Sequence, residues 1–196
     1  MSRLNVAMSK MSAARWAVYS RLMAVVWLRR ATSVGERTRT YFKPNIENRG
    51  RLVIGSGVRL NSNWAPLELV TGPLGEIVIG DGAYLNYGTI VSAQQRVSIG
   101  ANVMIGNYGV IADTEIPGIG LLDEQAIGTA RPIEIGDGAW LAARVTILPG
   151  VRIGDRAVIA AGSIVAGNIP PDAVAGGIPA RVLRHTRSAG SEAPAP

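Results

Sequence analysis

The sequence predicts a mainly β protein: a parallel β-helix in the form of a triangular prism, with an N-terminal α-helix. Three observations support this prediction. An aliphatic residue recurs every six positions, 24 of the 196 residues are glycine, and aromatic residues make up only 5%. A period of six is neither helical nor a simple strand alternation. It fits one short strand and one corner per repeat, with three repeats closing each turn of a solenoid.

The clearest repeat runs through the C-terminal half of the chain. Six aliphatic residues follow one another at intervals of six: Ile135, Leu141, Ile147, Ile153, Ile159 and Val165. The same phase occurs at Ile79, Leu85 and Val91, at Ile99, Ile105 and Ile111, and more weakly from Ile54. We expect these side chains to point inward, where burial of each contributes roughly 1.5–3 kcal/mol. The unbroken phase argues against the alternative, a β-sandwich with glycine-rich turns.

Two breaks interrupt the phase. Residues 91–99 contain two extra residues, and residues 112–131 are expected to form a loop that protrudes from the prism. The predicted β-helix covers residues 48–170. Residues 171–196 are predicted to be a C-terminal segment that ends in a disordered tail.

Residues 1–47 are predicted to be a basic N-terminal helix and linker. Residues 1–51 carry eleven Lys and Arg against Glu36 and Glu47, a net charge of +9, whereas the remainder has a net charge of −3. Residues 11–30 have the pattern of a helix, with one face formed by Trp16, Tyr19, Met23 and Trp27.

Two compatible interpretations of this helix remain open. It caps the first turn of the prism, or it lies in a membrane interface with its arginines near anionic lipid. Its apolar run, Leu22–Leu28, is too short to cross a bilayer. No secretory signal is recognised, so we expect a cytoplasmic protein that is either free or peripheral at the inner membrane surface.

Composition excludes several classes of function. The chain has no cysteine, which excludes disulfides and thiolate chemistry, and its single histidine is His185. Carbonic anhydrases with this prism need three histidines, so we predict no metal site. The basic residues follow no nucleic-acid reader motif, and no nucleic-acid partner is predicted.

Two segments carry a family resemblance. Residues 132–184 read PIEIGDGAWLAARVTILPGVRIGDRAVIAAGSIVAGNIPPDAVAGGIPARVLR, and residues 75–115 read GEIVIGDGAYLNYGTIVSAQQRVSIGANVMIGNYGVIADTE. Residues 48–184 thereby resemble the hexapeptide-repeat acyltransferases, in particular sugar and polysaccharide O-acetyltransferases of the galactoside and maltose type. The resemblance implies a left-handed parallel β-helix, a homotrimer with active sites between neighbouring prisms, and acetyl-CoA as acyl donor.

The resemblance also implies where coenzyme A binds. The matching positions are Ala143, Ala161, Gly177, Arg181 and Arg184. Small residues let the pantetheine arm approach the backbone, and the arginines can contact phosphates. In one respect the sequence departs from the family: Ala166-Gly167 replace a Thr-Lys pair, so a lysine directed at phosphate is missing.

The acceptor and the general base are less clear from the sequence. Asn86 and Tyr87 are the expected acceptor-binding residues, for a sugar, glycan or lipid-linked glycan. The family's catalytic histidine is replaced by Ile116 or Pro117, depending on the alignment, and neither accepts a proton.

Three explanations for this replacement remain open. Glu115 or Asp113 acts as the base; the acceptor is an amine that arrives deprotonated and needs only positioning; or the chain is a catalytically silent trimeric scaffold or binding protein. His185 follows Arg184 near the chain end and is expected to be a surface residue.

Overall fold

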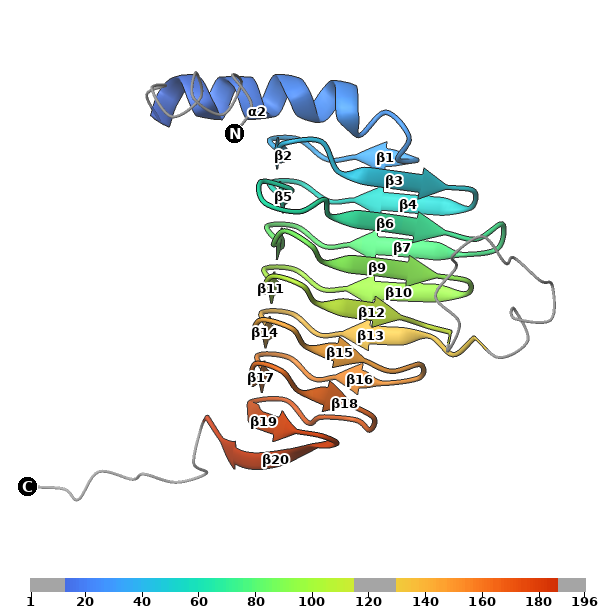
Figure 1. The fold of residues 1–196 in the computed structure, drawn as a ribbon, viewed down its shortest axis with the longest axis vertical. Coiled ribbons are helices and arrows are strands. Elements are labelled where there is room, and N and C mark those ends of the chain that lie inside the picture. The colour runs from blue at the N-terminus through green and yellow to red at the C-terminus, as the bar shows by residue number, and fades with distance from the viewer. Residues whose placement is uncertain (1–12, 115–129, 187–196) are drawn as a thin grey trace, which may run out of the picture.

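The computed structural model describes residues 13–114 and 130–186, and it confirms the predicted left-handed parallel β-helix. Three sheets form the faces of a triangular prism, and helix α2 lies across one end of it (Figure 1). From β1 to β18, successive strands belong to successive faces, so each strand pairs in parallel with the strand one turn later. The turns therefore rise along the axis by about 4.8 Å each, the spacing of paired strands.

The three faces are here called sheets A, B and C. Sheet A contains β1 (Ser33–Val34), β4 (Arg51–Ile54), β7 (Glu76–Ile79), β10 (Arg96–Ile99), β13 (Ile133–Ile135) and β16 (Arg152–Ile153). Sheet B contains β2 (Arg39–Tyr41), β5 (Arg59–Asn61), β8 (Tyr84–Leu85), β11 (Met104–Ile105), β14 (Trp140–Leu141), β17 (Val158–Ile159), β19 (Ala173–Gly177) and β20 (Ala180–His185). Sheet C contains β3 (Asn45–Asn48), β6 (Glu68–Thr71), β9 (Ile90–Ala93), β12 (Val110–Ala112), β15 (Thr146–Ile147) and β18 (Ile164–Val165).

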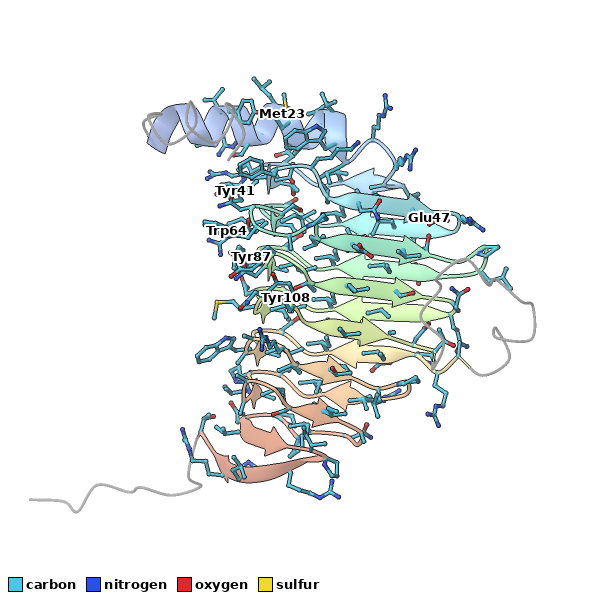
Figure 2. All side chains as sticks on the ribbon, viewed as in Figure 1. Met23, Tyr41, Glu47, Trp64, Tyr87 and Tyr108 are labelled. Atoms are coloured by element: carbon cyan, nitrogen blue, oxygen red, sulfur yellow. The ribbon has the colours of Figure 1, made fainter. Side chains whose placement is uncertain are left out.

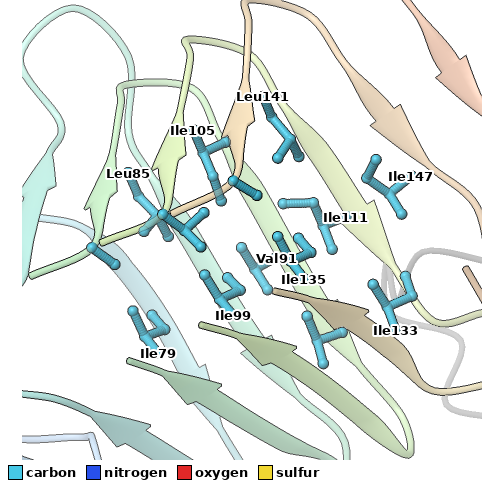
Figure 3. Close-up of a cluster of buried hydrophobic side chains, with 14 of the residues drawn as sticks. Ile79, Leu85, Val91, Ile99, Ile105, Ile111, Ile133, Ile135, Leu141 and Ile147 are labelled. Carbon is cyan, nitrogen blue, oxygen red and sulfur yellow. The ribbon is translucent and has the colours of Figure 1, made fainter. Parts of the chain in front are cut away.

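The core is a stack of aliphatic side chains inside the prism, and every residue of the predicted six-residue phase is buried in it. Figure 3 shows this stack, in which Ile79, Ile99 and Ile135 of sheet A lie one above another. Leu85, Ile105 and Leu141 stack in the same way on sheet B. The β-helix is thus held by burial of the aliphatic residue at each six-residue position, as the period predicted.

Glycine is required at the corner between sheets A and B, the A–B corner. A Cβ added to Gly136 would lie 2.6 Å from the backbone nitrogen of Asp155 in the next turn, and one on Gly80 would lie 2.6 Å from that of Ala101. Real Cβ atoms do not approach so closely, so only glycine lets consecutive turns stack there.

Residues 1–47 were predicted to be a helix and a linker that precede the prism, and the linker part of this prediction is wrong. Residues 33–48 form the first turn of the prism, through β1, β2 and β3. In this turn the inward position of sheet B is Thr40, six residues after Val34 on sheet A and six before Ile46 on sheet C. Thr40 and Thr38 are buried, and their hydroxyls donate to the carbonyls of Phe42 and Gly55, both at 2.7 Å. Because threonine replaces the aliphatic residue at position 40, the six-residue pattern is hidden.

Helix α2 (Ala13–Trp27) caps this first turn, as one interpretation predicted, but with a different face. Ser20, Ala24 and Leu28 are buried against the prism, while Tyr19, Met23 and Trp27 are only half-buried at the flanks. The face opposite the prism is also apolar. Its exposed residues are Val18, Leu22, Val25 and Val26. No helix in residues 13–114 and 130–186 has the length and apolarity needed to span a membrane.

The corner between sheets C and A, the C–A corner, accommodates nearly all the extra residues. Those between β9 and β10 are Gln94 and Gln95, and the long break after β12 leaves the prism at the same corner. Of that break, residues 115–129 lie outside the described residues, as does the predicted tail from 187 to 196.

We expect Gly136→Ala to lower the stability of the protein by about 1–3 kcal/mol, because the new methyl group collides with the backbone of the next turn. Thermal unfolding would show this as a fall of about 2–12 °C. Gly167→Ala is the control, since a Cβ there meets no atom within 4 Å. Equal melting temperatures for the two variants would contradict the stacking constraint.

Candidate functional site

The corner between sheets B and C, the B–C corner, brings several predicted site residues into one column. The N–H of Tyr108 donates to the Tyr87 carbonyl at 3.0 Å, and that of Arg144 donates to the Asn107 carbonyl at 2.8 Å. The N–H of Gly162 donates to the Ala143 carbonyl at 2.9 Å. Tyr87, Asn107, Ala143 and Ala161 thus occupy equivalent positions in four successive turns. The column extends about 14 Å along the axis.

The C-terminal part of this column is open. Ala143 is half-buried and Ala161 exposed, and a Cβ on Gly162 would meet no atom within 4 Å. Gly162 has a φ of +71°, a conformation that suits glycine. A chain-like ligand can therefore lie directly against the backbone at this edge.

The hairpin of β19 and β20 closes the column at the C-terminal end of the prism (Figure 1). Gly176 packs against Ala160, because a Cβ on Gly176 would lie 2.9 Å from the Ala160 methyl carbon. The N–H of Gly177 donates to Ser163 Oγ at 3.2 Å, so this N–H already has a partner within the chain.

The two predicted phosphate-binding arginines lie on β20, and both are exposed. Arg181 Nη1 donates to the Ala180 carbonyl at 3.2 Å, which leaves other guanidinium donors available. At the A–B corner near the same end of the prism, Arg156 donates two hydrogen bonds to the Asp172 carboxylate, from Nε at 2.7 Å and from Nη2 at 2.8 Å. Hydrogen bonding to the Asp172 carboxylate raises the pKa of Arg156.

Asn86 is the centre of a polar network on the outer face of sheet B. Its Oδ1 accepts hydrogen bonds from Asn61 Nδ2 at 2.9 Å, from Tyr84 Oη at 3.1 Å and from the Tyr87 N–H at 2.9 Å. The guanidinium carbon of Arg59 lies 5.2 Å from the centre of the Tyr84 ring, a cation–π contact. Asn86 therefore orients its neighbours.

The aromatic ring of Tyr87 packs edge-on against that of Tyr108, with ring centres 5.6 Å apart and planes at 90°. This geometry is a favoured one for aromatic pairs. Tyr108 also covers Gly88, where a Cβ would collide with its ring. The two tyrosines are thus held as a unit at the B–C corner.

Sequence reasoning missed several residues of this surface: Arg59, Asn61, Tyr84, Met104 and Trp140. Tyr84, Met104 and Trp140 are in register on neighbouring strands of sheet B and point outward. The sequence did contain a signal. Each stands directly before an inward aliphatic residue, and large aromatic or sulfur-containing side chains at such outward positions are unusual in this chain.

Asp113, one of the two candidate bases, is fully buried at the C–A corner. Its carboxylate accepts hydrogen bonds from three consecutive N–H groups, those of Gln94, Gln95 and Arg96, at 2.8, 2.7 and 2.8 Å. These contacts give Asp113 the role of closing the turn formed by the two extra residues between β9 and β10. Glu115, Ile116 and Pro117 lie outside the described residues.

Residues 13–114 and 130–186 contain no group of three His, Cys, Asp or Glu side chains that could hold a metal ion. The described site consists of backbone edges, amides, aromatic rings and guanidinium groups. Such groups bind ligands through hydrogen bonds, stacking and phosphate contacts.

These features define a class of protein: prisms of six-residue repeats with a narrow, ligand-accessible corner. The family model "Bacterial transferase hexapeptide (six repeats)" matches residues 132–167. The galactoside O-acetyltransferase of Escherichia coli (strain K12) is 41% identical over 108 residues, 55% of this chain and 53% of that protein. The chain belongs to the hexapeptide-repeat acyltransferase family, and it spans about half the length of the curated relatives it matches.

Solved structures agree with this assignment. A hexapeptide-repeat-containing acetyltransferase from Vibrio cholerae O1 biovar eltor, complexed with acetyl-CoA, is 30% identical. The match covers 67% of this chain and 72% of that one, with a TM-score of 0.50. A galactoside acetyltransferase in complex with coenzyme A is 25% identical with a TM-score of 0.53, covering 91% of this chain and 85% of that one.

Asp113→Asn should destabilise the fold by about 2–4 kcal/mol, because a neutral amide replaces a buried carboxylate that satisfies three N–H groups. The readout is thermal unfolding, with an expected decrease of about 4–16 °C. Asp81→Asn is the matched control: Asp81 is an exposed corner residue, and its Oδ1 accepts a hydrogen bond from the N–H of Ser56 at 2.7 Å. A melting temperature for Asp113→Asn equal to that of the control would argue against the structural role.

Proposed function

We propose that the protein is a CoA-dependent acyltransferase that moves an acetyl group to a hydroxyl or amine of a sugar or glycan precursor. The observation that carries this proposal is the B–C column, which aligns the small residues Ala143 and Ala161 with Tyr87. An acyl donor bound along Ala143 and Ala161 would place its acyl group toward the surface formed by Asn86 and Tyr87. The names of the E. coli and V. cholerae relatives support acetyl transfer.

Acetyl-CoA would supply a thioester-activated acyl group, and the residues present at the corner fit such a ligand. Ala143 and Ala161 leave the backbone open for the pantetheine arm, and the N–H of Gly177 joins the adjoining hairpin to Ser163 Oγ. Arg181 and Arg184 are exposed at the end of the column and offer guanidinium donors to phosphate groups.

The acceptor would bind on sheet B beside this column. We assign the NH₂ group of Asn86 and the ring and hydroxyl of Tyr87 to sugar contacts, with Tyr84 fixed beside them by its hydrogen bond to Asn86. Sugar hydroxyls suit amide donors and phenol groups, and sugar rings suit aromatic faces.

We propose Glu115 as the general base. The other candidate, Asp113, already accepts three backbone hydrogen bonds with its carboxylate. The column lies at the B–C corner, whereas Glu115 follows β12 at the C–A corner, so we assign this role to Glu115 of a neighbouring prism in the trimer. It accepts the proton of the acceptor hydroxyl as that oxygen bonds to the acyl carbon. It then returns the proton to the departing sulfur, so no proton is gained or lost. Such a base typically contributes about 10²–10⁴-fold in rate.

A homotrimer is part of this proposal, because the family resemblance implies active sites between neighbouring prisms. The competing proposal is a catalytically silent trimeric scaffold, which the replaced histidine favours. Binding of acetyl-CoA separates the two, since a scaffold has no need for the open corner.

Calorimetric titration of the purified protein with acetyl-CoA should show binding, and Arg181→Ala/Arg184→Ala should weaken it at least tenfold. Glu115→Gln should retain binding but lower the release of free CoA thiol, in the presence of simple sugars and amino sugars, by about 10²–10⁴-fold. Both effects follow from the separate roles of the arginines and the carboxylate.

The control for Glu115→Gln is Glu134→Gln, at an exposed carboxylate on sheet A that pairs with Arg152. Absence of acetyl-CoA binding up to millimolar concentration would favour the scaffold. Unchanged thiol release in Glu115→Gln would remove Glu115 as the base.

We further propose that α2 attaches the protein peripherally to an anionic membrane surface such as the inner membrane. Supporting this is the exposed apolar face of Val18, Leu22, Val25 and Val26, with Val25 77% exposed. Arg29, Arg30 and Lys43 line a hollow at the end of the helix. An apolar helical face edged by cations is typical of interfacial binding.

Sedimentation with vesicles tests this attachment. The protein should sediment with vesicles containing phosphatidylglycerol at low salt and much less with pure phosphatidylcholine, because the cations need anionic lipid. Leu22→Asp/Val25→Asp should reduce sedimentation at least fivefold. Leu74→Asp, which changes a 74% exposed leucine far from α2, should have no effect. A wild-type protein that stays in the supernatant at low salt would refute the attachment.

A further inference from the structure

We infer that the acceptor surface extends beyond Asn86 and Tyr87 toward the N-terminal end of the prism, and that it binds an extended glycan of several sugars. This inference rests on the proposed function, since it names the kind of acceptor that the same site takes. Four aromatic side chains labelled in Figure 2 follow one edge of the prism: Tyr41, Trp64, Tyr87 and Tyr108. Together with Phe42 they are called the aromatic ladder.

The aromatic residues are distributed very unevenly. Ten aromatic residues occur in the chain, and three belong to the N-terminal helix region. All of the other seven lie on sheet B or at the B–C corner: Tyr41, Phe42, Trp64, Tyr84, Tyr87, Tyr108 and Trp140. Sheets A and C have none, so the concentration follows one edge and not the protein as a whole.

These rings do not fill the core. The core is made of Ile, Leu, Val and Ala, and none of the seven aromatic side chains is buried. Burial therefore does not explain why they are there. Their positions suit contact with a ligand that presents apolar faces along the prism axis.

The polar groups among the rings identify the chemistry of that ligand. A hollow of about 380 Å³ is lined by Tyr41, Phe42, Arg59, Asn61, Asn63 and Tyr84. This volume lies in the usual range for ligand pockets. Aromatic faces stack on the C–H faces of sugar rings, while the amides and the guanidinium group bind hydroxyls. The combination is that of a carbohydrate surface.

Trp64 lies in an insertion between β5 and β6, at the B–C corner. The inward residues Leu60 and Leu69 are nine positions apart, where the turns from Leu85 onward have six. The insertion is ordered by its own hydrogen bonds: the N–H of Asn63 donates to Asn61 Oδ1 at 3.0 Å, and that of Leu67 to Ser62 Oγ at 3.2 Å.

The same Asn61 also donates to Asn86 at 2.9 Å. The insertion is therefore connected directly to the predicted acceptor residue. One side chain links the sugar contact proposed above to the loop that presents the 74% exposed Trp64.

The left-handed backbone conformation recurs at this corner. Tyr108 has a φ of +57° and Arg144, at the equivalent position one turn later, has +59°, whereas Gly88 and Gly162 take this position one turn earlier and two turns later. The conformation therefore belongs to the corner. Tyr108 holds it in spite of the usual preference for glycine, and its ring completes the ladder.

The spacing of the ladder fits a linear glycan. Its rings lie in successive turns, and each turn rises by about 4.8 Å, close to the length of one pyranose unit. From Tyr108 to Tyr41 the ladder spans three steps, about 14 Å. A glycan lying along this edge would place one end beside the acyl donor at Ala143.

The test is glycan binding as a function of chain length. Purified protein is titrated with series of one to eight sugars of the malto-, cello-, chito- and mannan types and with a printed array of bacterial polysaccharide fragments. We expect at least one series whose affinity increases tenfold or more from monosaccharide to tetrasaccharide. Trp64→Ala should remove at least tenfold of the tetrasaccharide affinity and leave monosaccharide and acetyl-CoA affinity unchanged.

Leu74→Ala is the matched control, because Leu74 has the same 74% exposure as Trp64 but lies at the C–A corner. Four results would overturn the inference: no glycan bound, equal affinity for short and long chains, full affinity in Trp64→Ala, or a change of oligomeric mass in that variant, which would make Trp64 a subunit contact.

The acetyl-CoA titration in the same samples separates this inference from the proposed function. Acetyl-CoA binding without length dependence refutes the extended surface alone. Length-dependent glycan binding without acetyl-CoA binding supports the surface and refutes acyl transfer.

Discussion

Each turn of this protein rests directly on the backbone of the next, and the rest of the structure depends on that contact. At the A–B corner the distance leaves no room for a Cβ, as Gly80 and Gly136 show. Hydrogen bonding between paired strands sets the rise at about 4.8 Å per turn, glycine at the corner permits it, and equivalent residues therefore form straight columns. Corner residues of one column are therefore evenly spaced along the axis. The stacking of the turns would position any ligand bound along them.

The sequence predicted the parts of the fold that depend on this repeat. The inward aliphatic residues were identified because one face per six residues must be apolar. The first turn was missed because Thr38 and Thr40 take inward positions and satisfy their hydroxyls with carbonyl groups. The packing face of α2 was missed for a different reason: apolar residues occur on every side of the helix, so its pattern does not show which side meets the prism.

For the candidate site, the sequence indicated positions but not partners. Ala143, Ala161 and Tyr87 were identified separately, and the turn-to-turn hydrogen bonds place them in one column. The bonds of Asn61 and Tyr84 to Asn86 join residues from neighbouring turns. The hydrogen bonds to the Asp113 carboxylate also join residues of neighbouring turns. Insertions change the sequence distance between such partners from turn to turn, so no fixed spacing reveals these contacts.

The C–A and B–C corners differ in how much their number of residues varies from turn to turn. The C–A corner accommodates extra residues in several turns, including the segment that contains Glu115. The B–C corner keeps a spacing of six residues in every turn from Leu85 to Val165. The proposed acyl donor would lie along the part of the B–C corner that has constant length, and the proposed base belongs to the segment of variable length. Asp113 lies where the variable segment begins: its buried carboxylate accepts three backbone hydrogen bonds two residues before Glu115.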